Sequence, residues 1–84
     1  MITGAQIRAA RAALRWSSEE LAHRSGLSPR TIKRFEQVDT IPPSRSSNLQ
    51  DVKKALESAG IEFVGAPEDG PGIRIRRSAD GAGS

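Results

Sequence analysis

Apolar residues recur at every third or fourth position through the first two thirds of the chain, which is the spacing of one face of a helix. Ile7, Ala10 and Leu14 follow this spacing, and the preceding Thr3-Gly4-Ala5-Gln6 has the capping-box pattern S/T-x-x-Q. The alanine-rich stretch that follows the box is strongly helix-forming. The pattern therefore predicts a first helix over about residues 4–15.

Two further cap signals predict two short helices that follow one another closely. Ser17 and Ser28 each stand directly before a periodic segment, where serine caps the start of a helix. Gly26 lies between the segments and is the residue type that ends a helix in the left-handed conformation. These signals predict helices over residues 18–25 and 29–37. So few residues separate them that the helices must cross steeply, which is the helix-turn-helix arrangement.

The rest of the chain changes from helical to strand-like spacing. A fourth helix is predicted over residues 48–59, because Ser47-Asn48-Leu49-Gln50 forms a capping box before a further apolar stripe. After Gly60 the apolar period falls from about 3.6 to 2 residues. Two short strands are therefore predicted around residues 61–63 and 73–75, joined by a loop rich in glycine and proline.

Together these elements predict a mainly α fold, in which a four-helix helix-turn-helix domain is followed by a short β-hairpin or strand pair. We expect the helix-turn-helix domain to occupy residues 1–60 and the strand extension residues 61–77, with a flexible tail over residues 78–84. A chain of 84 residues makes one domain with a small core.

The composition excludes several kinds of chemistry. The chain has no cysteine, which excludes disulfides, thiolate nucleophiles and Cys-ligated zinc, and its single histidine, His23, cannot make a metal site alone. No nucleophile, base and orienting group can be assembled, and no phosphate-binding glycine loop occurs. We therefore expect no enzyme activity, no metal and no cofactor. No apolar run approaches the roughly 18 residues that span a bilayer, so we expect a cytoplasmic protein without contact to a membrane.

The charge balance favours a polyanionic partner. Lys and Arg total 13 against 10 Asp and Glu, a formal net charge of +3. Arg30, Lys33 and Arg34 fall on the solvent face of the third predicted helix. An ordinary solvated helix carries such residues too. A basic second helix in a tight bihelical turn, however, fits the roughly 12 Å wide major groove of B-DNA.

The stretch WSSEELAHRSGLSPRTIKRFE, residues 16–36, resembles the Cro-repressor (XRE) family of helix-turn-helix transcriptional regulators. ITGAQIRAARAAL before it and DVKKALESAGIEF after it support the resemblance, which covers roughly the first 63 residues. The resemblance implies a lambda-repressor-like fold, double-stranded DNA as the partner, and a third helix that enters the major groove. The expected location is therefore the cytoplasm, in association with the nucleoid.

The resemblance also implies which residues contact DNA. Arg30 and Arg34 would bind guanine O6 and N7, or else phosphate only. Pro29 has no N–H donor, so it would offer at most an apolar contact. The implied base-reading residues are Pro29, Arg30, Lys33 and Arg34, and the implied phosphate contacts are Ser17, Ser18, Ser28, Thr31, Thr40 and Arg45.

Two further positions follow from the resemblance. Arg11 and Glu36 match family positions that form a partly buried ion pair between the first and third helices. Relatives commonly have glycine just after the recognition helix, where this chain has Val38-Asp39. The resemblance therefore does not predict the path of the loop there.

A single recognition helix reads only a few base pairs, so specificity favours a symmetric homodimer on a palindromic operator. An isolated two-stranded ribbon is marginal, so its apolar side chains must pack on the helices or pair with another chain. We hypothesise that strand addition across a twofold axis makes residues 61–77 the dimer interface. Relatives often dimerise through a helix instead. The side chains expected at this interface are Ile61, Phe63, Ile73 and Ile75.

Other functions fit the same fold. An antitoxin-like module would bind a partner toxin through its strands or tail and autoregulate through its helix-turn-helix. A protein-interaction adaptor would have lost DNA binding altogether. The regulator itself would repress by occluding a promoter or activate by contacting RNA polymerase. A co-purifying toxin would indicate the first of these, and unchanged mobility of all genomic fragments would indicate the second.

Overall fold

The computed structural model describes residues 2–66 and 68–76, so residues 77–84, with the predicted tail, lie outside the described part. Four helices are followed by a two-stranded antiparallel sheet, and the predicted fold class is confirmed. The elements in chain order are α1 (Gly4–Leu14), α2 (Ser18–Ser25), α3 (Pro29–Glu36), α4 (Ser46–Ser58), β1 (Ile61–Val64) and β2 (Gly72–Ile75).

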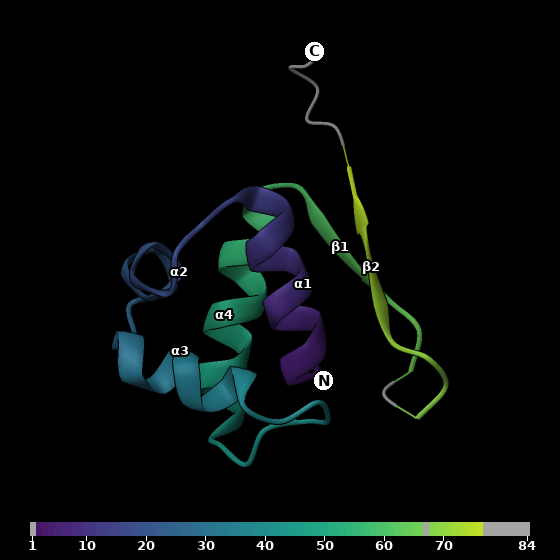
Figure 1. Ribbon diagram of the computed structural model, residues 1–84, viewed down its shortest axis with the longest axis horizontal. Helices are drawn as coiled ribbons and strands as arrows, with labels where there is room; N and C mark the ends of the chain where they lie inside the picture. Colours follow the sequence, from purple (N-terminus) through teal and green to yellow (C-terminus); the bar gives the residue numbers. More distant parts are fainter. Residues whose placement is uncertain (1, 67, 77–84) are drawn as a thin grey trace.

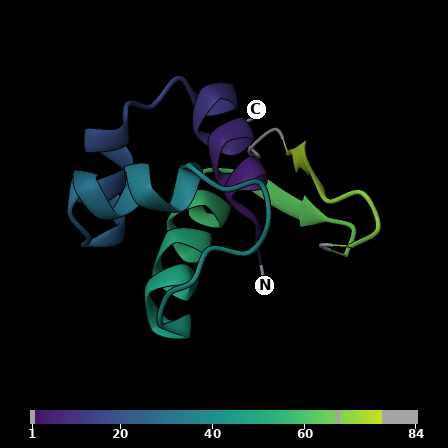
Figure 2. The ribbon, with the colours of Figure 1, turned by 60° about the horizontal axis from the view of Figure 1, so that its bottom comes forward.

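The helices α1 and α4 form the middle of the molecule. The pair α2 and α3 lies on one side of them and the β1–β2 hairpin lies on the other, as both ribbon views show (Figures 1 and 2). The two strands pack on different helices: β2 contacts α1, and β1 contacts α4. The longest helix described, α4, has 13 residues, and in residues 2–66 and 68–76 no helix combines the length and apolarity required to cross a bilayer.

Side-chain caps start the first three helices where the sequence predicts them. The backbone N–H of Gln6 donates to Thr3 Oγ1 at 3.1 Å, and the Thr3 N–H donates to Gln6 Oε1 at 2.9 Å, which completes the capping box. Ser17 and Ser28 accept in the same way at the starts of α2 and α3. Gly26 ends α2 with φ 75°, the left-handed value that glycine adopts without strain.

Four predicted helix ends differ from the structure by one or two residues: the ends of α1, α3 and α4 and the start of α4. The capping box at Ser47 does not form, because α4 already begins at Ser46 with Arg45 as its N-cap and no side-chain cap bond. The Arg45 carbonyl accepts from the N–H of Asn48 at 3.1 Å, so the first turn is closed before Ser47 can cap it. The first helix, α1, ends at Leu14 because Arg15 turns left-handed, with φ 58°.

One apolar core joins every helix to the hairpin. Phe35 of α3 is its largest side chain and is 0% exposed. Two members lie outside the helices, Ile2 before α1 and Ile61 at the start of β1, each 2% exposed. The buried hydrophobic residues are Ile2, Ile7, Ala10, Leu21, Ala22, Ile32, Phe35, Leu49, Val52, Leu56 and Ile61.

The hairpin is bonded to α1 by a buried polar side chain. Gln6, 3% exposed, donates from Nε2 to the Gly72 carbonyl at 2.8 Å and to the Val64 carbonyl at 3.4 Å. Phe63 and Ile73 face each other across the strands and pack partly against the core. Of the two possibilities for a two-stranded ribbon, packing on the helices is therefore the one seen within the chain.

Candidate nucleic-acid interface

The outer face of α3 carries the basic side chains predicted to read DNA. Ile32 and Phe35 are 0% exposed and hold the inner face of the helix in the core. The opposite face is exposed, and it forms an open hollow of about 440 Å³. The lining residues are spaced three and four apart, so they share one face of the helix. They are Arg30, Lys33, Arg34 and Gln37.

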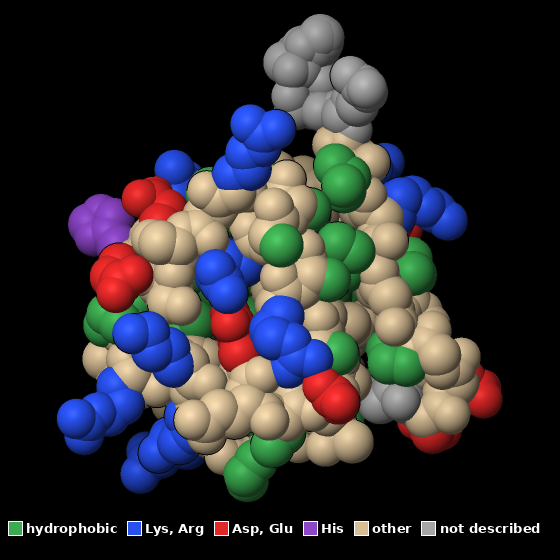
Figure 3. Space-filling view, in the orientation of Figure 1, with side chains coloured by type: hydrophobic (Ala, Val, Ile, Leu, Met, Phe, Trp, Pro, Cys, Tyr) green, Lys and Arg blue, Asp and Glu red, His purple; other side chains and the backbone are tan. Residues whose placement is uncertain are grey.

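These cations differ from most other arginines of the molecule in having no acidic partner. In the part of the chain that the structure describes, Arg30, Lys33 and Arg34 make no ion pair. Figure 3 shows Lys and Arg side chains gathered at the edge formed by α3, at the lower left of the view. Outside α3, carboxylates pair with Arg8, Arg11, Arg24, Arg74 and Arg76, whereas Arg15 and Arg45 make no ion pair among the described residues.

A tight turn sets α3 steeply against α2. The connection consists of Gly26, Leu27 and Ser28, and the N–H of Leu27 donates to the Ala22 carbonyl at 3.0 Å. Leu27 packs against the core as α3 begins. The last helix of this bihelical unit therefore lies at the edge of the molecule (Figure 1).

The hydroxyls predicted to bind phosphate are engaged to different extents. Ser28 Oγ accepts from the Thr31 N–H at 3.2 Å and lies 2.9 Å from Thr31 Oγ1. These two hydroxyls share one hydrogen bond, so only one of their protons remains for a phosphate oxygen. Ser17 Oγ accepts from the Glu20 N–H at 3.0 Å and keeps its own proton to donate. Ser18 is the first residue of α2, where free backbone N–H groups favour an anion.

The remaining predicted contacts lie in and beside the α3–α4 loop. Thr40 is exposed, and its carbonyl accepts from the N–H of Gly4 at 2.9 Å. Arg45 is exposed and stands at the start of α4. Pro29 is exposed as the first residue of α3. The structure brings the basic residues of α3 into one hollow and places the other predicted contacts on the neighbouring turns.

An ion pair fixes α3 to the body of the domain. Arg11 Nε donates to Glu36 Oε2 at 2.8 Å and Nη2 donates to Oε1 at 3.0 Å, with 26% and 9% of the side chains exposed. Arg11 Nη1 also donates to the Trp16 carbonyl at 3.0 Å. The hydrogen bond to Glu36 raises the pKa of Arg11 against the lowering effect of burial, with the charges of Glu36 and Glu19 adding to the rise. Arg11 therefore stays charged, and it ties α1, the α1–α2 turn and α3 together.

The sequence places one more residue on the exposed face of α3, but the resemblance assigned it no contact with DNA. Gln37 is the C-cap of α3 and lines the same hollow as the three cations. Its position, three residues after Arg34 and seven after Arg30, was the available signal, because residues at these spacings share a helix face. Its amide has the donor and acceptor that adenine N7 and N6 require.

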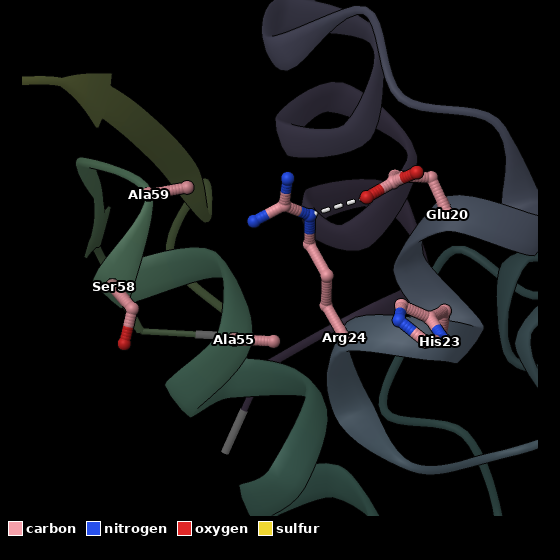
Figure 4. A pocket seen from close by; sticks show the side chains of 6 residues that line it. All are labelled: Glu20, His23, Arg24, Ala55, Ser58 and Ala59. Carbon is pink, nitrogen blue, oxygen red and sulfur yellow. Dashed lines mark hydrogen bonds and ion pairs between the residues drawn. The ribbon is translucent and has the colours of Figure 1, made fainter.

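A second hollow, of about 530 Å³, lies between α2 and α4 (Figure 4). Arg24 reaches toward Glu20, where its Nε donates at 2.6 Å, and its guanidinium lies 4.3 Å from the centre of the Trp16 ring. This cation is thus already neutralised, unlike those of α3. The residues around the hollow are Glu20, His23, Arg24, Ala55, Ser58 and Ala59.

In residues 2–66 and 68–76, no three His, Asp or Glu side chains lie together as a metal ion would require.

The fold and its exposed basic helix define the class of helix-turn-helix DNA-binding domains. The family described as "Helix-turn-helix domain" matches residues 3–60, and the chain belongs to this family. The match agrees with the resemblance to Cro-repressor (XRE) regulators. A search of the curated proteins finds no match to this chain.

Proposed function

We propose that the protein is a sequence-specific transcriptional regulator that inserts α3 into the major groove of DNA. In this proposal Arg30, Lys33 and Arg34 contact base edges, and Pro29 makes an apolar contact. Arg30 and Arg34 suit guanine, because a guanidinium offers two parallel donors to O6 and N7. The phosphate contacts are Ser17, Ser18, Ser28, Thr31, Thr40 and Arg45.

The observation that carries the proposal is the cluster of three cations on one face of α3, around a single hollow. Cations that serve the fold are paired with carboxylates, as Arg11 is with Glu36 at 2.8 Å. The cations of α3 are exposed and, among the described residues, have no carboxylate within ion-pair distance. Three like charges on two turns of one helix repel one another, and a polyanion removes that repulsion.

Selection of bound sequences from a random DNA library tests the proposal. The wild-type protein should enrich one motif. Arg30→Ala should then weaken binding to that motif by about 10- to 100-fold and weaken binding to random DNA much less. Lys54→Ala is the control, because it removes one positive charge from the exposed side of α4, outside both α3 and the proposed dimer interface. Enrichment of no motif would contradict the proposal.

We also propose that the protein binds as a homodimer, with the two copies of α3 about 34 Å apart on a palindromic operator. The expected interface contains Ile61, Phe63, Ile73 and Ile75. Ile61 is already 2% exposed within one chain, and Ile75 is 60% exposed. Ile75 is therefore the side chain of this set with most apolar surface left for a second copy to cover.

Sedimentation of the wild-type protein and of Ile75→Glu tests the dimer. The wild type should sediment as a dimer at micromolar concentration, and the variant as a monomer, because a carboxylate at the interface would be desolvated. Ile41→Glu is the control, since Ile41 is the other exposed large hydrophobic residue among those described, at 38%. A monomeric wild type would refute the dimer and leave the DNA-binding proposal standing.

A further inference from the structure

The C-terminal end of α3 lies directly against the first turn of α1 (Figures 1 and 2). The N–H of Gly4 donates to the Thr40 carbonyl just beyond α3. A Cβ on Gly4 would lie 2.0 Å from the Val38 oxygen and 2.3 Å from the Phe35 oxygen, so glycine is required there. The two backbones are thus in contact where the basic helix ends.

Arg8, one turn further along α1, binds the same end of α3 through its side chain. Its Nη1 donates to the Glu36 carbonyl and, at 3.4 Å, to the Val38 carbonyl. Its Nη2 donates to the Asp39 carboxylate. A guanidinium can make these contacts together, because its donors are fixed in one plane and point in several directions.

These contacts replace the usual end of a helix. The last carbonyls of any helix have no partner within it, and a left-handed glycine commonly closes the turn. Gln37, the C-cap of α3, is right-handed with φ −73°, and no described residue between Gly26 and Gly60 has a positive φ. Arg8 supplies donors in place of that turn, and its charge suits the negative end of the helix dipole.

We propose that Arg8 is a positioning residue of the DNA-binding surface: it holds the last turn of α3 and thereby sets where Arg34 and Gln37 reach. This inference rests on the proposed function. The bidentate contact proposed for Arg34 needs good alignment, and so would an adenine contact of Gln37, because hydrogen bonds weaken steeply as their angles depart from linear. Arg8 contributes by fixing α3, and its own donors are occupied by the protein.

Hydrogen exchange without DNA provides the first test. Arg8→Ala and Arg8→Lys should each speed exchange of the backbone amides of residues 37–40 by about tenfold, while amides in α4 keep their wild-type rates. Lysine is informative because it keeps the charge but carries a single ammonium, which cannot serve two carbonyls and a carboxylate in the same geometry. Unchanged exchange at residues 37–40 in both variants would overturn the inference.

Binding to the selected motif and to random DNA provides the second test. Arg8→Lys should bind random DNA as the wild type does, and its preference for the motif should fall by about fivefold or more. If Arg8 acted only by its charge or by its contribution to folding, Arg8→Lys would keep the full preference, and the inference would be wrong. Lys54→Ala, which removes a charge from the exposed side of α4, should keep the preference as well.

The two proposals fail in different ways. If the wild-type protein prefers no sequence, both the proposed function and the role of Arg8 in it are overturned. If the wild type prefers a motif and Arg8→Lys prefers it equally, only the role of Arg8 is overturned.

Discussion

Arg11 of α1 and Glu36 of α3 are joined by two parallel hydrogen bonds, of 2.8 and 3.0 Å, and the Glu36 side chain is only 9% exposed. Paired guanidinium and carboxylate groups of this geometry are among the stronger polar contacts in proteins. Because Glu36 lies in the last turn of α3, the pair fixes the helix that carries Arg30, Lys33 and Arg34.

Removal of either partner should destabilise the fold. We expect Arg11→Ala and Glu36→Ala each to lower the free energy of unfolding by about 2 to 4 kcal/mol, because the remaining charge stays partly buried without its partner. Urea unfolding followed by circular dichroism measures this. Glu20→Gln, which weakens the exposed Arg24–Glu20 pair, should change stability by less than about 0.5 kcal/mol. Equal effects at the two pairs would refute the structural role of Arg11 and Glu36.

Gly4→Ala should be strongly destabilising. Its Cβ would meet two backbone oxygens, at 2.0 and 2.3 Å, that cannot move without shifting the end of α3. We expect a loss of about 2 kcal/mol or more in thermal or urea unfolding. The control is Gly72→Ala, whose Cβ would lie 3.8 Å from Val64 Cγ2, an ordinary contact. If Gly4→Ala were as stable as this control, the close approach of α1 and α3 would be incorrect.

Gln6→Leu should loosen the hairpin. The amide bonds to the Gly72 and Val64 carbonyls would be lost together with the acceptor for the Thr3 N–H, at a cost of about 2 kcal/mol. Hydrogen exchange should rise first in β1 and β2. Exchange that rises equally in all elements would show that Gln6 supports the fold as a whole instead of attaching the hairpin.

Binding to DNA should weaken steeply with salt, because each neutralised phosphate releases counterions. Affinities for the selected motif at several salt concentrations give a slope, and Arg45→Ala should reduce it by about one unit. The same variant should keep the wild-type preference for the motif, since a phosphate contact carries no direct sequence information. An unchanged slope would remove Arg45 from the interface.

Local signals predicted most of the fold because they depend on neighbouring residues. Thr3, Ser17 and Ser28 cap the helices that the sequence assigns to them, and Gly26 adopts the left-handed conformation expected of it. Helical spacing likewise identified core residues such as Phe35. Capping residues, the helical spacing of apolar residues and a glycine at a helix end can all be recognised in the local sequence.

The features that the sequence did not predict depend on contacts between distant residues. Gln6 follows the capping pattern, yet its Nε2 bonds to a carbonyl 66 positions away. The sequence does not distinguish Arg8 from the other arginines, because its role depends on the end of α3 lying beside it in the fold. The start of α4 at Ser46 depends on the path of the loop between α3 and α4. At the candidate interface, spacing predicted the cations of α3 and the serine caps, but not the hydrogen bond between the hydroxyls of Ser28 and Thr31.

Ile61 is 2% exposed and lies just beyond the matched residues 3–60, so the matched segment alone does not contain the whole core. Cutting the chain after Gly60 would remove the Ile61 side chain and both acceptors of the Gln6 amide. It would leave an apolar cavity in the core and the Gln6 Nε2 donor without these hydrogen-bond acceptors. The four helices should therefore be fused to other proteins only together with the hairpin.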